Sequence, residues 1–386
     1  MPRTPNDAPV RRFAQTEVAA GVILVVASVV ALAWANSPWR AGYESLWSTT
    51  VQLHVGSLHF DEDLRHVVNE GLMAVFFFVI GLEIKRELVA GELRQWRAAA
   101  LPVIAALGGM AVPALLFTAF NAGGRGARGW GVPMATDIAF AMAVIALLGS
   151  HVPPPLKLFL LTLAIVDDAG AIVVIAVFYA GGVRFTALAL AAAGVVAIVV
   201  LRALGVRWAP VFVVLGIVVW FATFESGIHA TIAGAVLGLL VPAGPLGDRL
   251  HDHLHPDAGL VIVPLFALAN AGVRLRGDAF GAPGAWAVFA GVAIGLVVGK
   301  ALGVSAATWV AVRTGIGRLP EGTSWRQVVG VASVAGIGFT VSLFITDVAF
   351  GETVLEPSAK IAILVASAVA AVIGAAILAA APKRDR

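Results

Sequence analysis

Asp167 and Asp168 are adjacent carboxylates at the middle of an apolar run, residues 158–178, that is long enough to cross a bilayer as one helix. Each carboxylate at the centre of a membrane helix costs roughly 2.5–3.5 kcal/mol on the insertion scale, so apolar residues would be more favourable at both positions. An ionisable residue at this depth therefore indicates a functional site. Its occupant would be a proton, a metal cation, or each in turn.

Asp137 and Lys300 lie inside two other apolar segments, at a depth comparable to that of the aspartate pair. Opposite charges at one depth can pair, which lowers the cost of burying each. Adjacent helical residues point about 100° apart, so Asp167 and Asp168 cannot face one partner in the same way. We expect one of them to meet Lys300 and the other to face a water-filled cavity and bind a cation.

The ligand chemistry available at this depth favours an alkali cation. Na⁺ and Li⁺ prefer oxygen ligands, which carboxylates, threonine hydroxyls and free backbone carbonyls supply. The sequence contains no cysteine, which excludes disulfides, thiolate metal sites and thiol nucleophiles. Because protons and cations compete for one carboxylate, exchange needs no further machinery. We predict a transporter that is not an enzyme and needs no cofactor.

The composition is that of a polytopic all-α membrane protein. The chain has 386 residues, 60% of them hydrophobic and 13% charged, and a mean hydropathy of +0.93. Although the net charge is +3, the basic residues stand at the ends of apolar runs and never form one patch, so we expect a lipid bilayer and no nucleic acid as partner. Residues 1–386 are predicted to form a single integral membrane domain.

The apolar runs predict about twelve membrane spans. Their approximate limits are 17–35, 66–84, 98–120, 130–149, 157–179, 185–204, 209–224, 227–241, 258–273, 285–312, 327–347 and 359–381. Lys and Arg are more frequent on one set of loops, which favours both termini in the cytoplasm. The first run also resembles a cleaved secretory signal, but its apolar stretch is long for one, so we interpret it as a span.

The first external loop, residues 45–62, predicts a β-hairpin. Residues 51–55 and 58–60 alternate between apolar and polar side chains on either side of Gly56-Ser57. An isolated hairpin is marginal in water, so we expect it to contact a second copy of the chain in a homodimer. A loop with accidental alternation is the alternative.

Two spans are interrupted in their middles. Residues 131–137 bring a proline, a threonine and an aspartate to membrane depth, and residues 335–340 bring two glycines and a threonine there. Both segments predict broken helices, and their corresponding positions indicate inverted-topology repeats with a site where the broken helices cross at the midplane. Half-helix ends carry partial charges, which ionised groups would compensate.

At this point the chain resembles the NhaA family of sodium/proton antiporters. The segments that carry the resemblance are Ala135-Thr136-Asp137-Ile138-Ala139-Phe140-Ala141, Leu163-Ala164-Ile165-Val166-Asp167-Asp168, Gly81-Leu82-Glu83-Ile84-Lys85-Arg86-Glu87-Leu88, Ser226-Gly227-Ile228-His229-Ala230-Thr231, Gly299-Lys300 and Gly336-Ile337-Gly338-Phe339-Thr340. The resemblance implies a two-part helical bundle with alternating access about a cation site.

The resemblance also implies roles for individual residues. Asp168 would be the main cation ligand, while Asp167 would contribute to the transient Na⁺ or Li⁺ site and to proton coupling through a pair with Lys300. Dipole compensation and support at the crossing are implied for Asp137, Thr136, Lys300 and Thr340. The family moves two protons inward for each sodium ion outward, so one net charge enters per cycle. It implies a bacterial inner membrane and regulation by pH.

Glu83, Arg86 and Glu87 share one helical face at a predicted cytoplasmic end. From the sequence alone, such charges are typical of a solvated, self-paired helix terminus. The resemblance implies instead that they belong to a charged cluster that gates activity in response to pH.

A histidine-rich run is the last candidate site. His251 and His255 share a face at i, i+4, as zinc ligands can, but proton sensing together with Asp252 fits better because histidine changes charge near physiological pH. The family usually has Glu followed by His directly before a Leu-His-Pro sequence, whereas this chain has Asp252 followed by His253 before Leu254-His255-Pro256. His229 is either a hydrogen-bonded structural histidine or a further sensor.

Four rival functions remain open from the residues. A light-driven pump would carry retinal on Lys300, and an intramembrane aspartyl protease would use Asp137 with Asp168; visible absorption and peptide cleavage, respectively, would reveal them. A passive cation channel, or another proton-coupled cation transporter, is closest to the antiporter. Sodium-driven proton efflux from vesicles separates exchange from passive flow.

Overall fold

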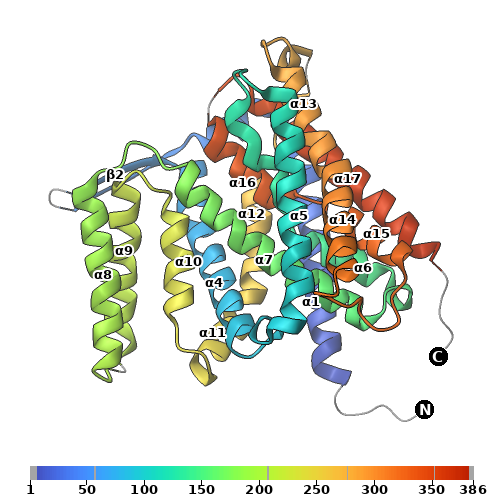
Figure 1. The fold of residues 1–386 in the computed structure, drawn as a ribbon. Helices are drawn as coiled ribbons and strands as arrows, with labels where there is room; N and C mark the ends of the chain where they lie inside the picture. Colours follow the sequence, from blue (N-terminus) through green and yellow to red (C-terminus); the bar gives the residue numbers. More distant parts are fainter. Residues whose placement is uncertain (1–6, 56–57, 207, 276, 352, 382–386) are drawn as a thin grey trace.

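The computed structural model describes residues 7–55, 58–206, 208–275, 277–351 and 353–381, most of them in helices packed into one bundle (Figure 1). The α-helices are α1 (Asp7–Ala35), α2 (Arg40–Trp47), α3 (Leu64–His66), α4 (Met73–Val89), α5 (Trp96–Asn121), α6 (Ile138–Leu147), α7 (Pro154–Phe178), α8 (Phe185–Ala203), α9 (Ala209–Glu225), α10 (Ala230–Leu240), α11 (Pro245–Asp257), α12 (Val263–Asn270), α13 (Ala285–Ile294), α14 (Lys300–Arg313), α15 (Trp325–Val334), α16 (Phe339–Phe350) and α17 (Glu356–Ala379). Short 3₁₀- or π-helical segments precede or join several of these helices. They include the π-helical η1 (Val67–Leu72), η5 (Ala258–Ile262) and η7 (Gly295–Gly299) and the 3₁₀-helical η3 (Ala127–Met134).

Among the described residues, eight helices are long and apolar enough to cross a membrane, or nine when the bent pair α15 and α16 counts as one span. Helices α9 and α10 are apolar but shorter. The prediction of a mostly helical membrane protein is confirmed, whereas the count of twelve stays a prediction. The ninth predicted span, 258–273, differs most from the structure, because the helical path there begins at Pro245 and runs through α11, η5 and α12.

Small residues let several helices touch backbone to backbone. A Cβ at Gly234 of α10 would meet the Ala74 carbonyl of α4, and one at Gly303 of α14 would meet the Gly108 carbonyl of α5. Without a hydrophobic force between helices in lipid, close van der Waals packing of this kind is what holds membrane bundles together. These contacts position α4, α5 and α14 around the centre of the molecule.

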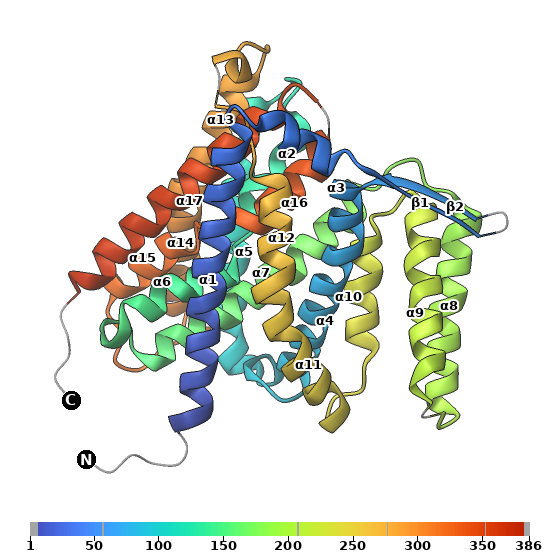
Figure 2. The same cartoon turned by 180° about the vertical axis from the view of Figure 1, so that it is seen from behind.

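The predicted hairpin forms. Strand β1 (Thr50–Val55) pairs antiparallel with β2 (Leu58–Asp63), with Thr50 opposite Asp63 and Val55 opposite Leu58. The predicted turn, Gly56-Ser57, lies outside the described residues. Figures 1 and 2 show the hairpin projecting from the bundle over the ends of α8 and α9.

Both predicted breaks are present. Turn η3 ends at Met134, residues 135–137 are extended, and α6 begins at Ile138. Helix α15 ends at Val334, and α16 begins at Phe339 with a bend of 46° between their axes. A proline in the first break and glycines in the second explain why neither helix continues.

Candidate functional site

The two breaks contact each other through their exposed backbone groups. The Asp137 N–H donates to the Ile337 carbonyl at 2.6 Å, and the Thr136 hydroxyl donates to the Ala335 carbonyl at 2.8 Å. Because backbone groups buried in a membrane must be satisfied within the protein, these bonds allow both chains to be non-helical at this depth. The site is therefore built on a fixed crossing of two chain segments that lie far apart in the sequence.

Asp137 caps two helices with one carboxylate. Its Oδ1 accepts from the Phe140 N–H at 2.9 Å in the first turn of α6, where Asp137 is the N-cap. Its Oδ2 accepts from the Thr340 N–H at 3.1 Å and from the Thr340 hydroxyl at 2.6 Å in the first turn of α16. A negative charge at two helix N-termini is the geometry that dipole compensation requires.

Asp167 and Lys300 form a buried ion pair. The Lys300 Nζ donates to Asp167 Oδ2 at 2.6 Å, and both side chains have no solvent exposure. Lys300 begins α14 directly after the wide turn η7, while Asp167 comes from the middle of α7. The pair joins α7 to α14 and neutralises one of the two adjacent aspartates.

Asp168 faces elsewhere, as expected for the next residue along a helix. It lines a cavity together with Asp137, Thr340, Glu83 and His255. The Oδ1 atom of Asp168 is buried and has no hydrogen-bond partner among the described residues. An unpaired carboxylate oxygen beside a cavity can take up a proton or a hard cation.

Comparison with known proteins explains this arrangement. The family model described as Na⁺/H⁺ antiporter 1 matches residues 11–378. The chain belongs to the NhaA family of Na⁺/H⁺ antiporters. It is 45% identical to Na(+)/H(+) antiporter NhaA 3 of Frankia alni, over 97% of this chain and 89% of that protein. It is 46% identical to the NhaA antiporters of an Acidovorax species and of Escherichia coli O1:K1, over 95% and 94% of this chain and 90% and 96% of those proteins.

Membership of the NhaA family supports Na⁺/H⁺ exchange by this chain, with Na⁺ and H⁺ as substrates. It places the chain among transporters and not among enzymes. The homologues are bacterial, and the apolar helices fit a multi-pass membrane protein.

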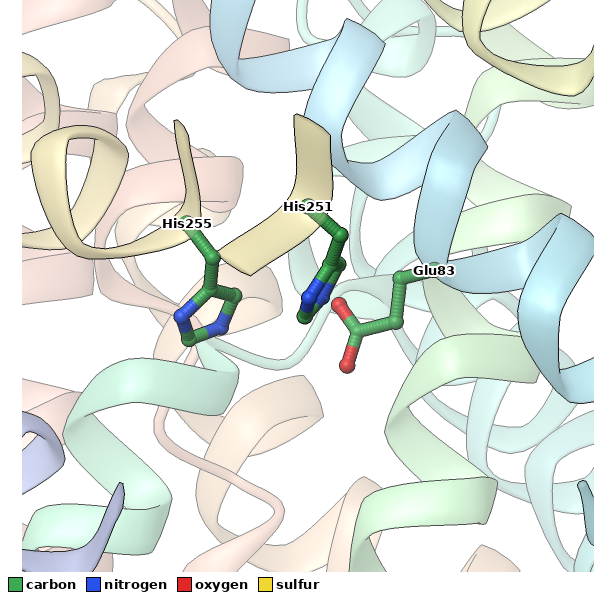
Figure 3. Close-up of side chains that lie close together, drawn as sticks. All are labelled: Glu83, His251 and His255. Carbon is green, nitrogen blue, oxygen red and sulfur yellow. The ribbon is translucent and has the colours of Figure 1, made fainter. Parts of the chain in front are cut away.

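The charged residues predicted to sense pH lie where α4 packs against α11. Glu83 of α4 faces His251 and His255 of α11 (Figure 3). Arg86 Nε lies 3.9 Å from Asp248 Oδ1, with both side chains about half exposed. Glu87 points instead toward the following turn, where its Oε1 accepts from the Glu92 N–H at 2.8 Å.

The two histidines differ from ordinary surface histidines. Burial, followed by the neighbouring His251, lowers the pKa of His255 to about 4. Burial, followed by Arg86, also lowers the pKa of His251. Asp252, which is mostly exposed, lies 3.6 Å from His251 Nδ1, beyond hydrogen-bond distance. Burial therefore disfavours the charged form of both imidazoles.

His229 has a specific acidic partner. Its Nδ1 lies 2.8 Å from Oε1 of Glu70, whose Oε2 accepts from the Ala230 N–H at 2.7 Å at the start of α10. From the sequence, Glu70 is interpreted as a boundary residue near the start of the second predicted span, but it is only 6% exposed. Its partner could not be identified because the two residues are far apart along the chain.

A second polar network was missed for the same reason. The Asn69 amide donates to Asp347 Oδ2 at 2.9 Å, and the Asn270 amide donates to Asn69 Oδ1 at 2.7 Å. This network joins η1, α12 and α16. Isolated asparagines inside apolar runs are a weak signal, although polar side chains in membrane helices often bond across helices.

Proposed function

We propose that the chain exports Na⁺, and also Li⁺, in exchange for H⁺ import, with Asp168 binding the cation or a proton in turn. The observation that supports this most directly is that the two adjacent aspartates have different surroundings. Each aspartate has one buried oxygen without a hydrogen-bond partner, but Asp167 is paired with Lys300, whereas Asp168 has no ion pair among the described residues and lines the cavity. Thr340 lines the same cavity and offers a hydroxyl oxygen as a further ligand for an alkali ion.

Asp167 and Lys300 are proposed to couple a second proton to the same cycle. A cation that enters beside Asp168 adds positive charge next to Lys300, which favours loss of a proton from the ammonium group. The exchange would then carry two protons inward for each sodium ion outward. One net positive charge would enter per cycle, so an inside-negative membrane potential would drive sodium export.

The proposed location is a bacterial inner membrane with both termini in the cytoplasm, and the proposed architecture has inverted-topology repeats. The excess of Lys and Arg on one set of loops supports this orientation. Under it, α11 and the C-terminal end of α4 lie on the cytoplasmic side, because they lie at the end of the bundle where α1 begins (Figure 2).

Exchange and its charge are tested in proteoliposomes that contain the purified chain and a pH dye. We expect added sodium to drive proton efflux, and a clamped potential to move the equilibrium sodium gradient about 50-fold per 100 mV, since one charge in that potential is worth about 2.3 kcal/mol. No dependence on potential would contradict two protons per sodium ion. Sodium flux that moves no protons would indicate the passive channel instead.

Regulation by pH is proposed to involve His229, with Glu70 as the acidic group that faces it. Histidine is the side chain that most readily changes charge near neutral pH. Glu83, Arg86, Glu87, His251, Asp252 and His255 are further candidates at the contact of α4 with α11. The same dye assay, repeated across a pH series, shows whether the exchange rate follows pH.

The hairpin is proposed to join two copies of the chain. In the part of the chain that the structure describes, β1 and β2 form a two-stranded sheet, so each strand keeps one unpaired edge. Replacing residues 50–63 by a short Gly/Ser linker is expected to convert a dimer into a monomer, as measured by light scattering in detergent. A dimer that survives this deletion would place the interface elsewhere.

A further inference from the structure

Glu83, His251 and His255 bring three potential metal ligands together outside the aspartate site. Their ligand atoms all lie within 4.8 Å of one another. Figure 3 shows both imidazole rings, from α11, next to the Glu83 carboxylate of α4. Two histidines at i, i+4 on one helix, completed by a carboxylate from a second helix, form a ligand set that Zn²⁺ commonly uses.

We propose that these three side chains bind a divalent transition-metal ion of the Zn²⁺ class. His251 is 9% exposed, and neither of its ring nitrogens has a hydrogen-bond partner among the described residues. A buried imidazole without a partner is costly, and a metal ion would satisfy it.

The spacing of the ligand atoms suits one ion. Tetrahedral Zn²⁺ with bonds of about 2.0–2.2 Å holds its ligand atoms about 3.4 Å apart, so small side-chain rotations bring all three onto it. Three protein ligands leave a fourth position for water. The positive charge of Arg86 lies nearby and opposes the binding of a cation. The carboxylates of Asp248 and Asp252, both on α11, offset that charge.

This site differs in chemistry from the alkali-ion site. Asp168 and Thr340 offer only oxygen, which suits Na⁺ and Li⁺, whereas two imidazoles favour a softer divalent ion. Glu83 and His255 also line the cavity that Asp168 lines. An ion bound by them would hold α4 against α11 and obstruct that cavity. This last consequence rests on the proposed exchange, but the metal site itself does not.

Binding is tested on the purified full-length chain in detergent, carrying an affinity tag that contains no histidine. Calorimetry with Zn²⁺ is expected to give one ion per chain, and Co²⁺ is expected to show the visible absorption of a tetrahedral site. Mg²⁺, which prefers oxygen ligands in octahedral geometry, serves as the control ion. No saturable Zn²⁺ binding, or equal binding of Mg²⁺, would overturn the proposal.

Substitutions locate the ion. His251→Ala and His255→Ala are each expected to weaken Zn²⁺ binding at least about tenfold, since even the loss of a group that only supports a ligand costs 10–100-fold. His253→Ala is the matched control, because that ring is exposed and its Nδ1 contacts the Arg249 carbonyl at 2.7 Å. If alanine impairs folding, as judged by gel filtration, His255→Gln replaces it. Unchanged binding in both ligand variants would refute the site.

Exchange is measured separately in proteoliposomes with and without Zn²⁺. Saturating Zn²⁺ is expected to slow sodium-driven proton efflux in the unaltered chain and in His253→Ala. Binding without any slowing would overturn the obstruction of the cavity. Absence of exchange before Zn²⁺ is added would count against the proposed function, and not against the metal site.

Discussion

Replacing Asp168 with asparagine is expected to abolish Na⁺/H⁺ exchange. The amide has nearly the same shape, but it carries no charge and cannot alternate between a proton and a cation. At a separation of about 4 Å and an effective dielectric constant of about 20, the lost attraction is about 4 kcal/mol, so sodium binding should weaken roughly 1,000-fold. Dye-reported exchange in everted vesicles across a pH series measures the effect.

Asp257→Asn is the matched control for this experiment. Its side chain is exposed at the end of α11 and lies outside the residues that line the Asp168 cavity. It should retain exchange, whereas normal exchange in Asp168→Asn would refute Asp168 as the cation ligand. Calorimetry adds a second test, because sodium binding to the unaltered chain should release protons and binding to Asp168→Asn should not.

Replacing Lys300 with leucine should destabilise the fold by about 3–5 kcal/mol, because it leaves the Asp167 carboxylate buried without its partner. The same loss is expected for Asp167→Leu, which leaves the ammonium group unpaired. Thermal unfolding of each variant in one detergent, monitored by intrinsic fluorescence, measures the change.

The double variant Lys300→Leu/Asp167→Leu separates the ion pair from the site itself. Removing both charges should restore most of the stability, since apolar replacements of a buried pair are often neutral. Proton coupling should still be lost if the pair serves the transport cycle. A double variant as unstable as the sum of the single variants would show that the two groups do not depend on each other.

The two breaks were predictable from local sequence. Pro133 and the glycines Gly336 and Gly338 interrupt apolar runs, and backbone rules alone imply that helices stop there. A pair between Lys300 and one of the two aspartates was predictable for a different reason, while its assignment to Asp167 came from the resemblance to the NhaA family. Charges at one depth of a membrane protein are too costly to remain apart, so few partners were possible.

Other parts of the site depend on contacts that no local pattern reveals. The polar residues before the ninth predicted span are helical from Pro245 as α11, and no local pattern revealed that α11 packs against α4. Glu70 appeared to be a boundary residue because its partner His229 lies far along the chain. Asn69 and Asn270 were missed on the same grounds.

The carboxylate of Asp137 has a mechanical consequence for any inward- to outward-facing transition. One side chain accepts hydrogen bonds from the first turns of both α6 and α16. Separating these half-helices would therefore leave several hydrogen-bond donors without an acceptor at once. The two half-helices should therefore travel as a single rigid piece. The movement that opens the cavity to one side or the other must then come from neighbouring helices such as α4 and α11, whose charged contact is easier to separate.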